Sequence, residues 1–416
     1  MPGLRPYQQA AIDSARTAVQ AGHRRILLVS PTGTGKTKIL AAIAKSCVAR
    51  GGSVHWYAHR RELIDQARAE CPEAEVISTQ AAVRNPRPSP TLQIFDEAHH
   101  YVATEWATLL SPTATIVGAT ATPERGDGIG LGEAFDHLIP VISIAEATAQ
   151  GHLVPCTVHA PEEQLRKNQL AQYPWAAYRQ FAPGEPAIVF APTVDVASDI
   201  AEGFRNAGIR ARHIHYETKD RDEVIAQFKS GEIQVLVNVF ILTEGFDHPP
   251  TSVCILARGC GSAGTYLQMV GRVLRPAEGK TRAVLIDLRG VRHVHGDPAT
   301  ERIYSLDGIG IRQDKPEDEE RFCEVCGSLM VEGECEDCGP KSILDPEPQQ
   351  ILNVQMKIFA RDICAADTPE TMVQRLGRWM REAEAKQFKP GQAMWRFKSV
   401  YGRWPTYQEK QLAARI

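Results

Sequence analysis

A short apolar segment followed by a glycine-rich loop constrains this chain more than any other stretch. Residues 26–29 are four aliphatic residues in a row, which predicts a buried parallel strand. The next eight residues read Ser-Pro-Thr-Gly-Thr-Gly-Lys-Thr and lead into a helix-like pattern over 38–48. Glycines let backbone N–H groups approach an anion, and the helix N-terminus behind them favours a phosphate. We therefore predict a nucleoside-triphosphate site between this strand and this helix.

The side chains of the loop each have a chemical task if a triphosphate binds there. The ammonium of Lys36 reaches the β- and γ-phosphates, and the hydroxyl of Thr37 ligates Mg²⁺. One position departs from the usual G-x-x-x-x-G-K-[ST] pattern, because Ser30 stands where the first glycine is expected. An ordinary tight turn is the alternative, but it leaves the Lys-Thr pair unexplained. Four further residues are expected to contact the nucleotide: Thr32, Gly33, Thr34 and Gly35.

Residues 4–8, Leu-Arg-Pro-Tyr-Gln, begin a helix-like pattern upstream of the loop. A proline near the first turn agrees with a helix start, and a helix start alone is the alternative interpretation. A glutamine amide offers a donor and an acceptor together, which matches the edge of adenine, and a tyrosine offers a stacking face. We therefore predict that Arg5, Tyr7 and Gln8 contact the adenine of ATP.

Length and composition limit the class of protein. A chain of 416 residues is long for one hydrophobic core, so two or three domains are expected. No apolar run approaches the ~20 residues of a membrane span, and the start lacks the apolar core of a secretory signal. We therefore expect a cytoplasmic protein. The net charge of −3 does not indicate nucleic acid, but a basic groove can coexist with acidic outer faces.

Further apolar runs predict strands at 54–58, 75–78, 92–95 and 115–118. The third of these ends in Asp-Glu-Ala-His. A carboxylate at the carboxyl end of a strand, beside a phosphate loop, is placed to hold Mg²⁺. We predict that Asp96 has this role and that Glu97 is the base that orients the attacking water. An acidic surface turn is the alternative for this tetrapeptide taken alone.

Four segments in this order resemble the motifs of superfamily 2 helicases and translocases. Residues 30–37 are similar to motif I, 58–66 (AHRRELIDQ) to motif Ia, 96–99 (DEAH) to motif II, and 118–123 (GATATP) to motif III. The resemblance implies that Arg60 and Thr79 lie near nucleic-acid phosphates. It also implies that motif III links the state of ATP to the grip on the strand.

The second half of the chain predicts another parallel α/β layer, because strand-like and helix-like segments alternate. Strands are expected at 187–191, 211–214, 234–239, 253–256 and 282–288, and helices at 194–206, 219–229 and 263–273. This half carries no phosphate loop. We therefore expect one nucleotide to bind in the cleft between the two layers.

The second layer is expected to supply positive charge for the γ-phosphate. Residues 268–275, Gln-Met-Val-Gly-Arg-Val-Leu-Arg, provide two arginines one turn apart and resemble motif VI. This likeness implies that Arg272 and Arg275 are arginine fingers and that Gln268 faces His99 when the domains close. Leu274 stands where many relatives have glycine. An exposed basic helix is the alternative.

Two other segments of the second half resemble motifs V and IV. Residues 240–247, Phe-Ile-Leu-Thr-Glu-Gly-Phe-Asp, follow a predicted strand and are similar to motif V. The resemblance implies that Gly245 and Asp247 contact the ribose side of the nucleotide and that Thr243 contacts nucleic acid. Residues 190–193 are similar to motif IV, in which Thr193 contacts the nucleic-acid backbone.

Four cysteines cluster after an acidic run at 314–321. Two C-x-x-C pairs, each followed by a glycine, allow four thiolates to converge tetrahedrally on Zn²⁺. Disulfides and a redox centre are the less favoured alternatives. We predict a structural zinc site formed by Cys323, Cys326, Cys335 and Cys338.

Residues 356–416 carry twelve Lys and Arg against six Asp and Glu, an excess of six positive charges, with aromatic residues between them. Basic and aromatic side chains suit backbone neutralisation and base stacking. The same aromatics at helical spacing are also typical of the core of a small helical bundle. We expect a helical module that contacts nucleic acid or a protein of replication or recombination.

Taken together, these patterns predict an α/β protein with two tandem RecA-like parallel-sheet domains at 1–160 and 161–312. A linker and zinc ribbon at 313–345 and a mainly helical module at 346–416 are expected to follow. The combined motifs resemble those of restriction-type DNA translocases and RadD-type repair helicases. They imply an ATP- and Mg²⁺-dependent motor on nucleic acid, with DNA favoured, in repair, recombination or fork remodelling of a bacterium or phage. An RNA helicase and an ATP-switched scaffold are the alternatives.

Overall fold

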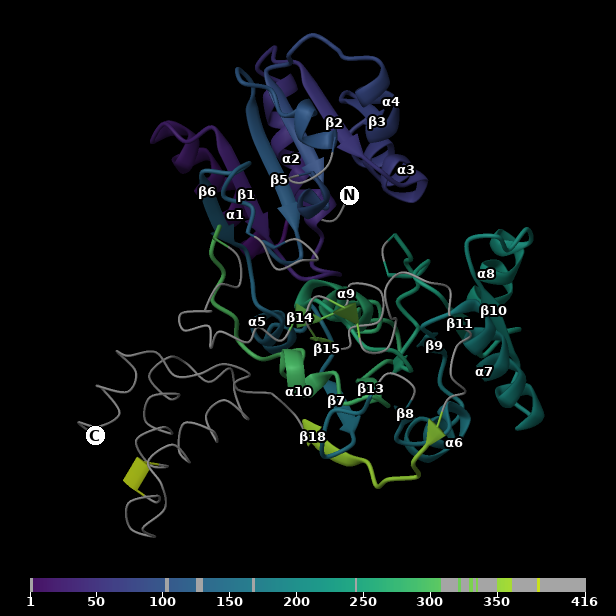
Figure 1. The fold of residues 1–416 in the computed structure, drawn as a ribbon. Helices are drawn as coiled ribbons and strands as arrows, with labels where there is room; N and C mark the ends of the chain where they lie inside the picture. The colour runs from purple at the N-terminus through teal and green to yellow at the C-terminus, as the bar shows by residue number, and fades with distance from the viewer. Residues whose placement is uncertain are drawn as a thin grey trace.

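A computed structural model describes residues 3–101, 105–124, 130–166, 169–243, 245–307 and 350–360. It also gives the backbone of short segments at 321–322, 329–331, 334–335 and 380–381. Two parallel sheets with helices on their faces dominate this part of the chain (Figure 1). The predicted fold class, two RecA-like α/β domains, is confirmed.

The first sheet contains six strands, all of them parallel, in the order β3-β2-β4-β5-β1-β6. Its strands are β1 (Arg25–Val29), β2 (Val54–Ala58), β3 (Glu75–Ser78), β4 (Leu92–Asp96), β5 (Thr115–Thr120) and β6 (His137–Pro140). The helices of this half are α1 (Pro6–Gln20), α2 (Lys36–Val48), α3 (Arg61–Glu70), α4 (Thr79–Arg84) and the 3₁₀ turns η1 (Ala98–His100) and η2 (Glu105–Leu109). The next helix, α5 (Ile144–Ala149), packs against the core of the second sheet.

The second sheet has seven strands in the order β10-β11-β9-β12-β13-β7-β18. They are β7 (Cys156–Ala160), β9 (Ala187–Phe190), β10 (Ala211–Ile214), β11 (Val235–Asn238), β12 (Val253–Leu256), β13 (Ala283–Asp287) and β18 (Lys357–Ala360). The accompanying helices are α6 (Pro174–Phe181), α7 (Val194–Asn206), α8 (Arg221–Lys229), α9 (Ala263–Gly271) and α10 (Arg292–His295). All strand pairs are parallel except β18, which runs antiparallel along β7.

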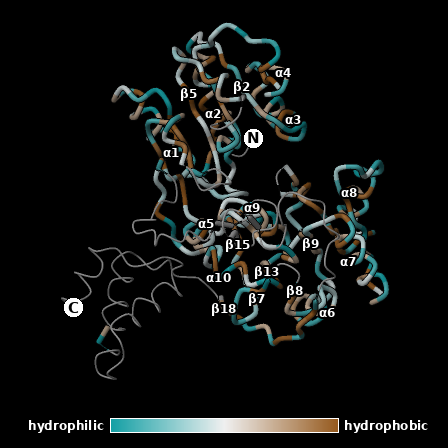
Figure 2. The backbone as a smooth tube through the Cα atoms, viewed as in Figure 1, coloured by the Kyte–Doolittle hydropathy of each residue, from teal (hydrophilic) through white to brown (hydrophobic). Residues whose placement is uncertain are grey.

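Apolar layers on both faces of each sheet hold the elements together. Buried aliphatic runs form the central strands, whereas the helices are apolar on one side only. Figure 2 shows hydrophilic residues alternating with hydrophobic ones along α3 and α7. On α7 the side toward the sheet is formed by Ala197, Ile200, Ala201 and Phe204, all buried. This amphipathic pattern explains why these segments fold as covering helices.

Strand pairing differs from the domain limits predicted from the sequence. β7 lies within the range 1–160 assigned to the first domain but pairs with β13 of the second sheet. β18 lies within the range 346–416 assigned to the helical module but pairs with β7. Both assignments depend on contacts between distant segments, which a local pattern does not contain. The other predicted domain limits stay predictions.

Two small sheets complete the described backbone. β8 (Gln169–Leu170) pairs with β17 (Gln350–Ile351). An antiparallel sheet is formed by β14 (Arg321–Phe322), β15 (Leu329–Val331) and β16 (Glu334–Cys335). The predicted zinc ligands Cys323, Cys326 and Cys338 lie outside the described residues, and only the backbone of Cys335 is described. Nearly all of the predicted helical module also lies outside them.

Among the helices in the described part of the chain, none has the length and hydrophobicity needed to span a lipid bilayer.

Candidate active site

The glycine-rich loop between β1 and α2 has the shape expected of an anion-binding loop. Gly33 and Gly35 have φ angles of 89° and 84°, in the left-handed region that only glycine adopts without strain. The hydroxyl of Thr34 donates to the Pro31 carbonyl at 2.6 Å and also lies 2.6 Å from Oγ of Ser30. Since the Thr34 proton is already used, the Ser30 hydroxyl donates to Thr34. Ser30, the one departure from the usual pattern, therefore stabilises the loop through its hydrogen bond to Thr34.

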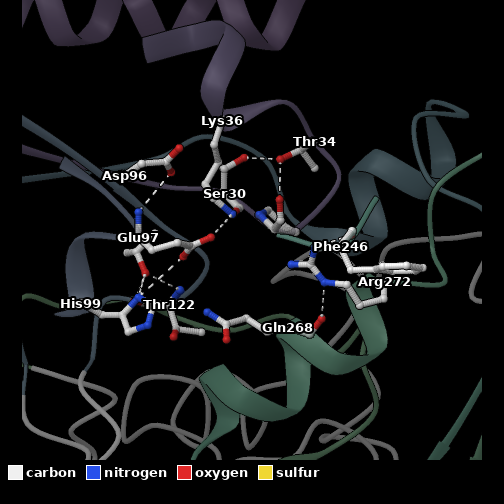
Figure 3. Close-up of polar contacts among 12 residues, drawn as sticks. Ser30, Thr34, Lys36, Asp96, Glu97, His99, Thr122, Phe246, Gln268 and Arg272 are labelled. Carbon is white, nitrogen blue, oxygen red and sulfur yellow. Dashed lines mark hydrogen bonds and ion pairs between the residues drawn. The ribbon is translucent and has the colours of Figure 1, made fainter. Parts of the chain in front are cut away.

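Lys36 opens α2 and points at the acidic residues that follow β4 (Figure 3). Its Nζ lies 3.6 Å from Oε1 of Glu97 and donates to the Ser30 carbonyl at 3.3 Å. Oδ1 of Asp96 accepts from the Glu97 backbone N–H at 3.0 Å. Lys36, Asp96 and Glu97 are all buried, whereas Thr37 is half-buried in the first turn of α2. The structure thus brings together the four side chains assigned to the γ-phosphate and Mg²⁺.

Glu97 has a strained backbone, with φ at 51°, which a non-glycine residue rarely adopts. This turn directs its carboxylate back toward the loop rather than along the strand. Oε2 lies 3.7 Å from Nδ1 of His99, which lies 3.0 Å from Oγ1 of Thr120. Because Thr120 donates its own proton to the Thr122 carbonyl at 2.8 Å, His99 is the donor to Thr120. Motifs II and III are therefore joined by hydrogen bonds.

The C-terminal end of α9 packs directly on the phosphate loop. A Cβ placed on Gly271 would lie 2.6 Å from Cβ of Thr32, so only glycine permits this approach. A Cβ placed on Gly33 would lie 2.9 Å from Cγ of Arg275. The second sheet's arginine helix is thus already in contact with the loop of the first sheet. The two halves are therefore in contact at the loop, and the binding of one nucleotide between them stays a prediction.

The two arginines of motif VI are held differently. Arg272 is buried, and its Nη1 donates to the Phe246 carbonyl at 2.9 Å (Figure 3). Its Nε donates to the Gln268 carbonyl at 3.3 Å. Arg275 pairs with Asp247, which the sequence placed near the ribose. α9 ends at Gly271, earlier than the predicted end at 273, so Arg272 caps the helix and Arg275 lies in the segment that follows it.

Gln268 lies on the side of α9 that faces motif III. One helical turn earlier, a Cβ on Gly264 would lie 2.5 Å from Oγ1 of Thr122. Residues four apart share a helix face, and Figure 3 shows Gln268 beside Thr122. The expected contact between Gln268 and His99 stays a prediction.

Unsatisfied polar atoms around the loop indicate what the cleft can hold. Within the described part of the chain, Oγ1 of Thr32, Oε2 of Glu97 and Nε of Arg275 are buried without a hydrogen-bond partner. Buried polar atoms normally have partners, so orphans mark a ligand position. A guanidinium N–H and a hydroxyl suit phosphate oxygens, and a carboxylate suits a water or Mg²⁺. The residues present therefore fit a metal-bound triphosphate.

The N-terminal segment contacts the loop itself. Tyr7 donates its hydroxyl proton to the Thr34 carbonyl at 2.6 Å, and Nε2 of Gln8 donates to the same oxygen at 3.0 Å. Oε1 of Gln8 accepts from the Arg5 backbone N–H at 2.9 Å, and Nη1 of Arg5 donates to the Tyr7 hydroxyl at 3.1 Å. These three residues thus fix the loop, a role that the sequence did not reveal. Their contact with adenine stays a prediction.

The residues assigned to nucleic acid are more scattered. Arg60, at the start of α3, donates from Nη1 to the Ile241 carbonyl of the second half at 3.3 Å. Gly245 lies near α3, since a Cβ placed on it would lie 3.4 Å from Cβ of Glu62. Both belong to the facing surfaces of the two halves. Their nucleic-acid roles stay predictions.

Three threonines assigned to nucleic acid differ in what they offer. Thr193 is half-buried at the start of α7, where its hydroxyl accepts from the Val196 N–H at 3.3 Å. Thr243 is buried, and its hydroxyl lies 3.4 Å from the Phe240 carbonyl. Thr79 is fully buried, and its hydroxyl bonds to that of Tyr101 at 2.8 Å. In this structure Thr79 therefore presents no surface to a nucleic acid.

An irregular segment after α10 returns from the second half of the chain to the first, and no local sequence pattern predicted it. After α10, the Leu306 carbonyl accepts from the Gly132 N–H at 2.8 Å. Leu306 and Tyr304 pack on the apolar layer under β5, and burial raises the pKa of the Tyr304 hydroxyl. Tyr304 also lies beside Thr32 and Gly271, where the two halves meet. A tyrosine in an irregular segment carries no local signal that would have singled it out.

Known families match both halves of the chain. Residues 2–80 match the family model described as "Type III restriction enzyme, res subunit", and residues 170–277 match "Helicase conserved C-terminal domain". The "51.5 kDa protein" of a Lactococcus phage is 27% identical over 374 residues, covering 81% of this chain and 82% of that protein. The "Putative mitochondrial ATP-dependent helicase irc3" of Schizosaccharomyces pombe is 29% identical over 360 residues, covering 71% of this chain.

This chain spans 59% of the length of the yeast helicase. Among solved structures, a fragment of a putative HsdR subunit of a type I restriction enzyme from Vibrio vulnificus superposes with a TM-score of 0.57. That match has 23% sequence identity and covers 79% of this chain and 70% of the other. At this identity, the likeness shows the shared fold.

Proposed function

The chain belongs to superfamily 2 of the ATP-dependent helicases, and from that premise we propose that it is a DNA-stimulated ATPase that moves along nucleic acid. The observation that carries this proposal is the packing of α9 on the phosphate loop. The approach of Gly271 to Thr32 and of Arg275 to Gly33 supports a cleft with the ATP-binding residues on one wall and the arginine fingers on the other. Opening and closing of that cleft is the motion that ATP turnover would drive.

The first wall binds and activates the triphosphate. Lys36 and the loop N–H groups hold the β- and γ-phosphates, while Thr37 and Asp96 would hold Mg²⁺. When bound, Mg²⁺ would neutralise negative charge on the phosphates. Glu97 orients the attacking water and accepts its proton on Oε2, a buried oxygen that has no hydrogen-bond partner within the described part of the chain. His99 lies 3.7 Å from this same oxygen and connects Glu97 to motif III.

The second wall stabilises the charge that develops on the γ-phosphate. Arg272 is fixed by the Phe246 and Gln268 carbonyls, so its guanidinium loses little freedom when phosphate arrives. Arg275 would exchange Asp247 for a phosphate oxygen. Since both arginines are donated by the second sheet, they reach the γ-phosphate only in a closed molecule. This is why nucleic acid that favours closure would stimulate hydrolysis.

DNA is the substrate that we favour over RNA. The DEAH, GATATP, TEGFD and QMVGRVLR segments resemble those of restriction-type DNA translocases. The family model over residues 2–80 and the Vibrio vulnificus neighbour are both described as restriction enzymes, which act on DNA. We accordingly propose a role in repair, recombination or fork remodelling. An RNA helicase and an ATP-switched scaffold are the other outcomes of the tests below.

Two variants of the first wall test the chemistry. Lys36→Ala removes the cation on the phosphates, and we expect an ATPase rate lower by roughly a hundredfold or more. Glu97→Gln keeps the shape but not the base, so it should bind ATP normally and hydrolyse it slowly. Lys38→Ala, which changes an exposed lysine two residues from Lys36, is the matched control. Wild-type turnover by Glu97→Gln would contradict its assignment as the base.

A substrate panel tests the partner. ATPase rates are compared with single-stranded DNA, branched DNA and RNA at two salt concentrations, because phosphate contacts weaken with salt. We expect the largest stimulation with DNA. Larger stimulation by RNA would favour the RNA helicase. ATP hydrolysis without strand displacement or translocation on any substrate would favour the scaffold.

We also propose that the cysteine cluster binds Zn²⁺. The proposal rests on the spacing of the two C-x-x-C pairs in the sequence, and of the four cysteines only Cys335, in β16, has a described backbone. A ribbon this short needs a metal to fold. Elemental analysis of the purified protein is expected to give one zinc per chain. Absence of zinc from protein purified without chelator would contradict the proposal.

A further inference from the structure

The carboxyl edge of the second sheet presents a row of three side chains, of which one, Phe240, begins the motif V segment and the other two lie outside the motifs. Across this sheet, Ile214, Asn238, Phe190 and Leu256 are register partners on adjacent strands. Three side chains follow two residues after the partners on β10, β11 and β12: Tyr216, Phe240 and Arg258, in that order. In parallel α/β sheets, ligands bind at this edge of the strands. The row therefore occupies the usual ligand-binding side of the domain.

Phe240 is held in a conformation that its side chain alone would not choose. Its φ angle is 58°, in the left-handed region, which is costly for a bulky residue. Such strain persists where the surrounding structure imposes it and is concentrated at functional sites. The residue nevertheless keeps 41% of its surface exposed. The fold therefore keeps a partly exposed phenylalanine in a backbone conformation that glycine would adopt without strain.

Arg258 supports one face of that ring. Its guanidinium carbon lies 3.6 Å from the Phe240 ring centroid, in a cation–π arrangement. Arg258 is itself buried, and its Nε donates to the Gly259 carbonyl at 3.1 Å. A buried, bonded arginine is a rigid support. Since Arg258 covers one face of the ring, the exposed surface is available for a second flat group.

Tyr216 extends this surface onto the next strand. It is 80% exposed, and the His215 ring lies 6.0 Å from it. β10 and β11 are adjacent parallel strands, about 4.8 Å apart. Tyr216 and Phe240 stand at equivalent distances beyond the pair Ile214–Asn238. Two exposed aromatic residues that follow neighbouring strands suit the stacking of successive bases.

The row faces the first half of the molecule. Arg60 of the first half bonds to the carbonyl of Ile241, the residue directly after Phe240. Arg221, at the start of α8, forms an ion pair with Glu62 of α3 at 2.9 Å. The row therefore lies at the contact between the two halves. Its surroundings would change when the cleft opens.

We propose that Phe240, supported by Arg258, and Tyr216 form a stacking surface for the unpaired bases of a single-stranded nucleic acid. The inference rests on the proposed function and adds how the strand is gripped. Phosphate contacts alone hold the backbone of any strand, whereas stacking requires bases that are free of a duplex. The surface therefore selects single-stranded over double-stranded substrate.

Affinity for two probes of equal length and charge tests the surface. One is a single-stranded oligothymidylate, and the other is the corresponding abasic oligomer. Wild type is expected to prefer the first. Phe240→Ala should weaken binding of oligothymidylate roughly tenfold or more while leaving the abasic probe nearly unaffected. Tyr216→Ala should act in the same direction, and Phe240→Tyr should restore the preference. An oligouridylate arm reports whether the surface also accepts RNA.

Two further variants make the test specific. Phe240→Gly removes both ring and strain, so it should raise the melting temperature yet lose the preference for bases. Tyr173→Ala removes another exposed aromatic of the same half. Tyr173 stacks on Trp175, which packs on Gly203 near the end of α7, away from the carboxyl edge. It should behave as wild type.

The possible outcomes distinguish a failure of the stacking surface from a failure of the proposed function. A wild-type preference for bases in Phe240→Ala, Tyr216→Ala and Phe240→Gly would overturn the stacking surface and leave the motor intact. Equal binding of both probes by wild type would overturn it as well. Failure of wild type to bind either probe would overturn the proposed function, and the stacking surface with it.

Discussion

The two parallel sheets are built alike, but the ends of their strands carry opposite chemistry. In the first sheet, β1 leads into the phosphate loop and β4 into Asp96 and Glu97. In the second, β12 leads into Arg258, and α9 leads into Arg272 and Arg275. One edge is suited to a metal and an anion, and the other supplies cations and aromatic rings. Neither edge contains a complete site for hydrolysis.

This difference implies a division of labour. Each sheet has an apolar layer of its own, and a further apolar cluster joins Tyr7 and Ile142 to the core of the second sheet. Turnover belongs to the contact, which consists of glycines that let α9 approach the loop and arginines that cross to it. A substitution at the contact should therefore slow catalysis without unfolding either half. A substitution inside one half should do the reverse.

The largest effect is expected from the arginines. Arg275→Ala and Arg272→Ala should each lower the nucleic-acid-stimulated turnover rate by on the order of a thousandfold, with ATP affinity much less affected. Arg282→Ala is the matched control, because Arg282 pairs with Glu185 at the opposite edge of the same sheet. Steady-state ATPase assays and binding of a fluorescent ATP analogue give the two quantities. Loss of ATP binding equal to the loss of turnover would assign the arginines to ground-state binding instead.

A smaller effect is expected from the glycine that admits the loop. Gly271→Ala adds a methyl group 2.6 Å from Cβ of Thr32, which should push α9 off the loop and slow turnover roughly tenfold to a hundredfold. Because alanine favours helix, the melting temperature should not fall. Gly203→Ala, whose added Cβ would meet the Trp175 ring at 2.1 Å, should lower stability by about 1–3 kcal/mol. Thermal melts and ATPase rates of both variants decide the comparison. Equal behaviour of the two would remove the distinction.

The smallest effect concerns acid stability of the two halves. Burial lowers the pKa of His159 to about 4, helped by the Arg282 charge, and burial lowers that of His295 to about 4, opposed by its bond to the Cys260 carbonyl. Both folded values lie below the unfolded value of 6.5. The unfolded chain therefore binds more protons between these limits, and the stability present above pH 6.5 is lost as the pH falls toward 4.

We expect each of these histidines to remove on the order of 1–3 kcal/mol over that range. Since both belong to the second half, that half should open first, as limited proteolysis at decreasing pH would report. His295→Gln keeps a donor for Cys260 without titrating and should flatten the response. His293→Gln, on the exposed side of the same helix, should not. Earlier opening of the first half would contradict this order.

Local patterns in the sequence predicted the strands and the chemistry at their ends. The expected strands 54–58 and 75–78 match β2 and β3 residue for residue, as the helix 194–206 matches α7. These segments are set by runs of apolar residues and by turn residues next to them. The positions of Lys36 and Glu97 are likewise set locally, because each residue follows closely after one strand. Such features involve near neighbours along the chain, so the chain itself specifies them.

Contacts between residues far apart in the sequence could be identified only from the structure. The sequence could not assign β7 and β18 to the second sheet, because strand pairing is decided between segments more than a hundred residues apart. It could not indicate that Gln8 bonds to the loop through the Thr34 carbonyl or that the Thr79 hydroxyl is taken by Tyr101. Those partners are chosen by three-dimensional proximity.

The sequence by itself thus determined that the chain has a phosphate loop, acids at a strand end and a pair of arginines. Each is a short pattern whose chemistry is carried by adjacent residues. Only the tertiary structure decided that Gly271 and Gly33 let α9 reach the loop and that Phe240 is held exposed on Arg258. The physical reason is that these arrangements depend on how closely two folded surfaces approach, and no stretch of either surface contains that distance.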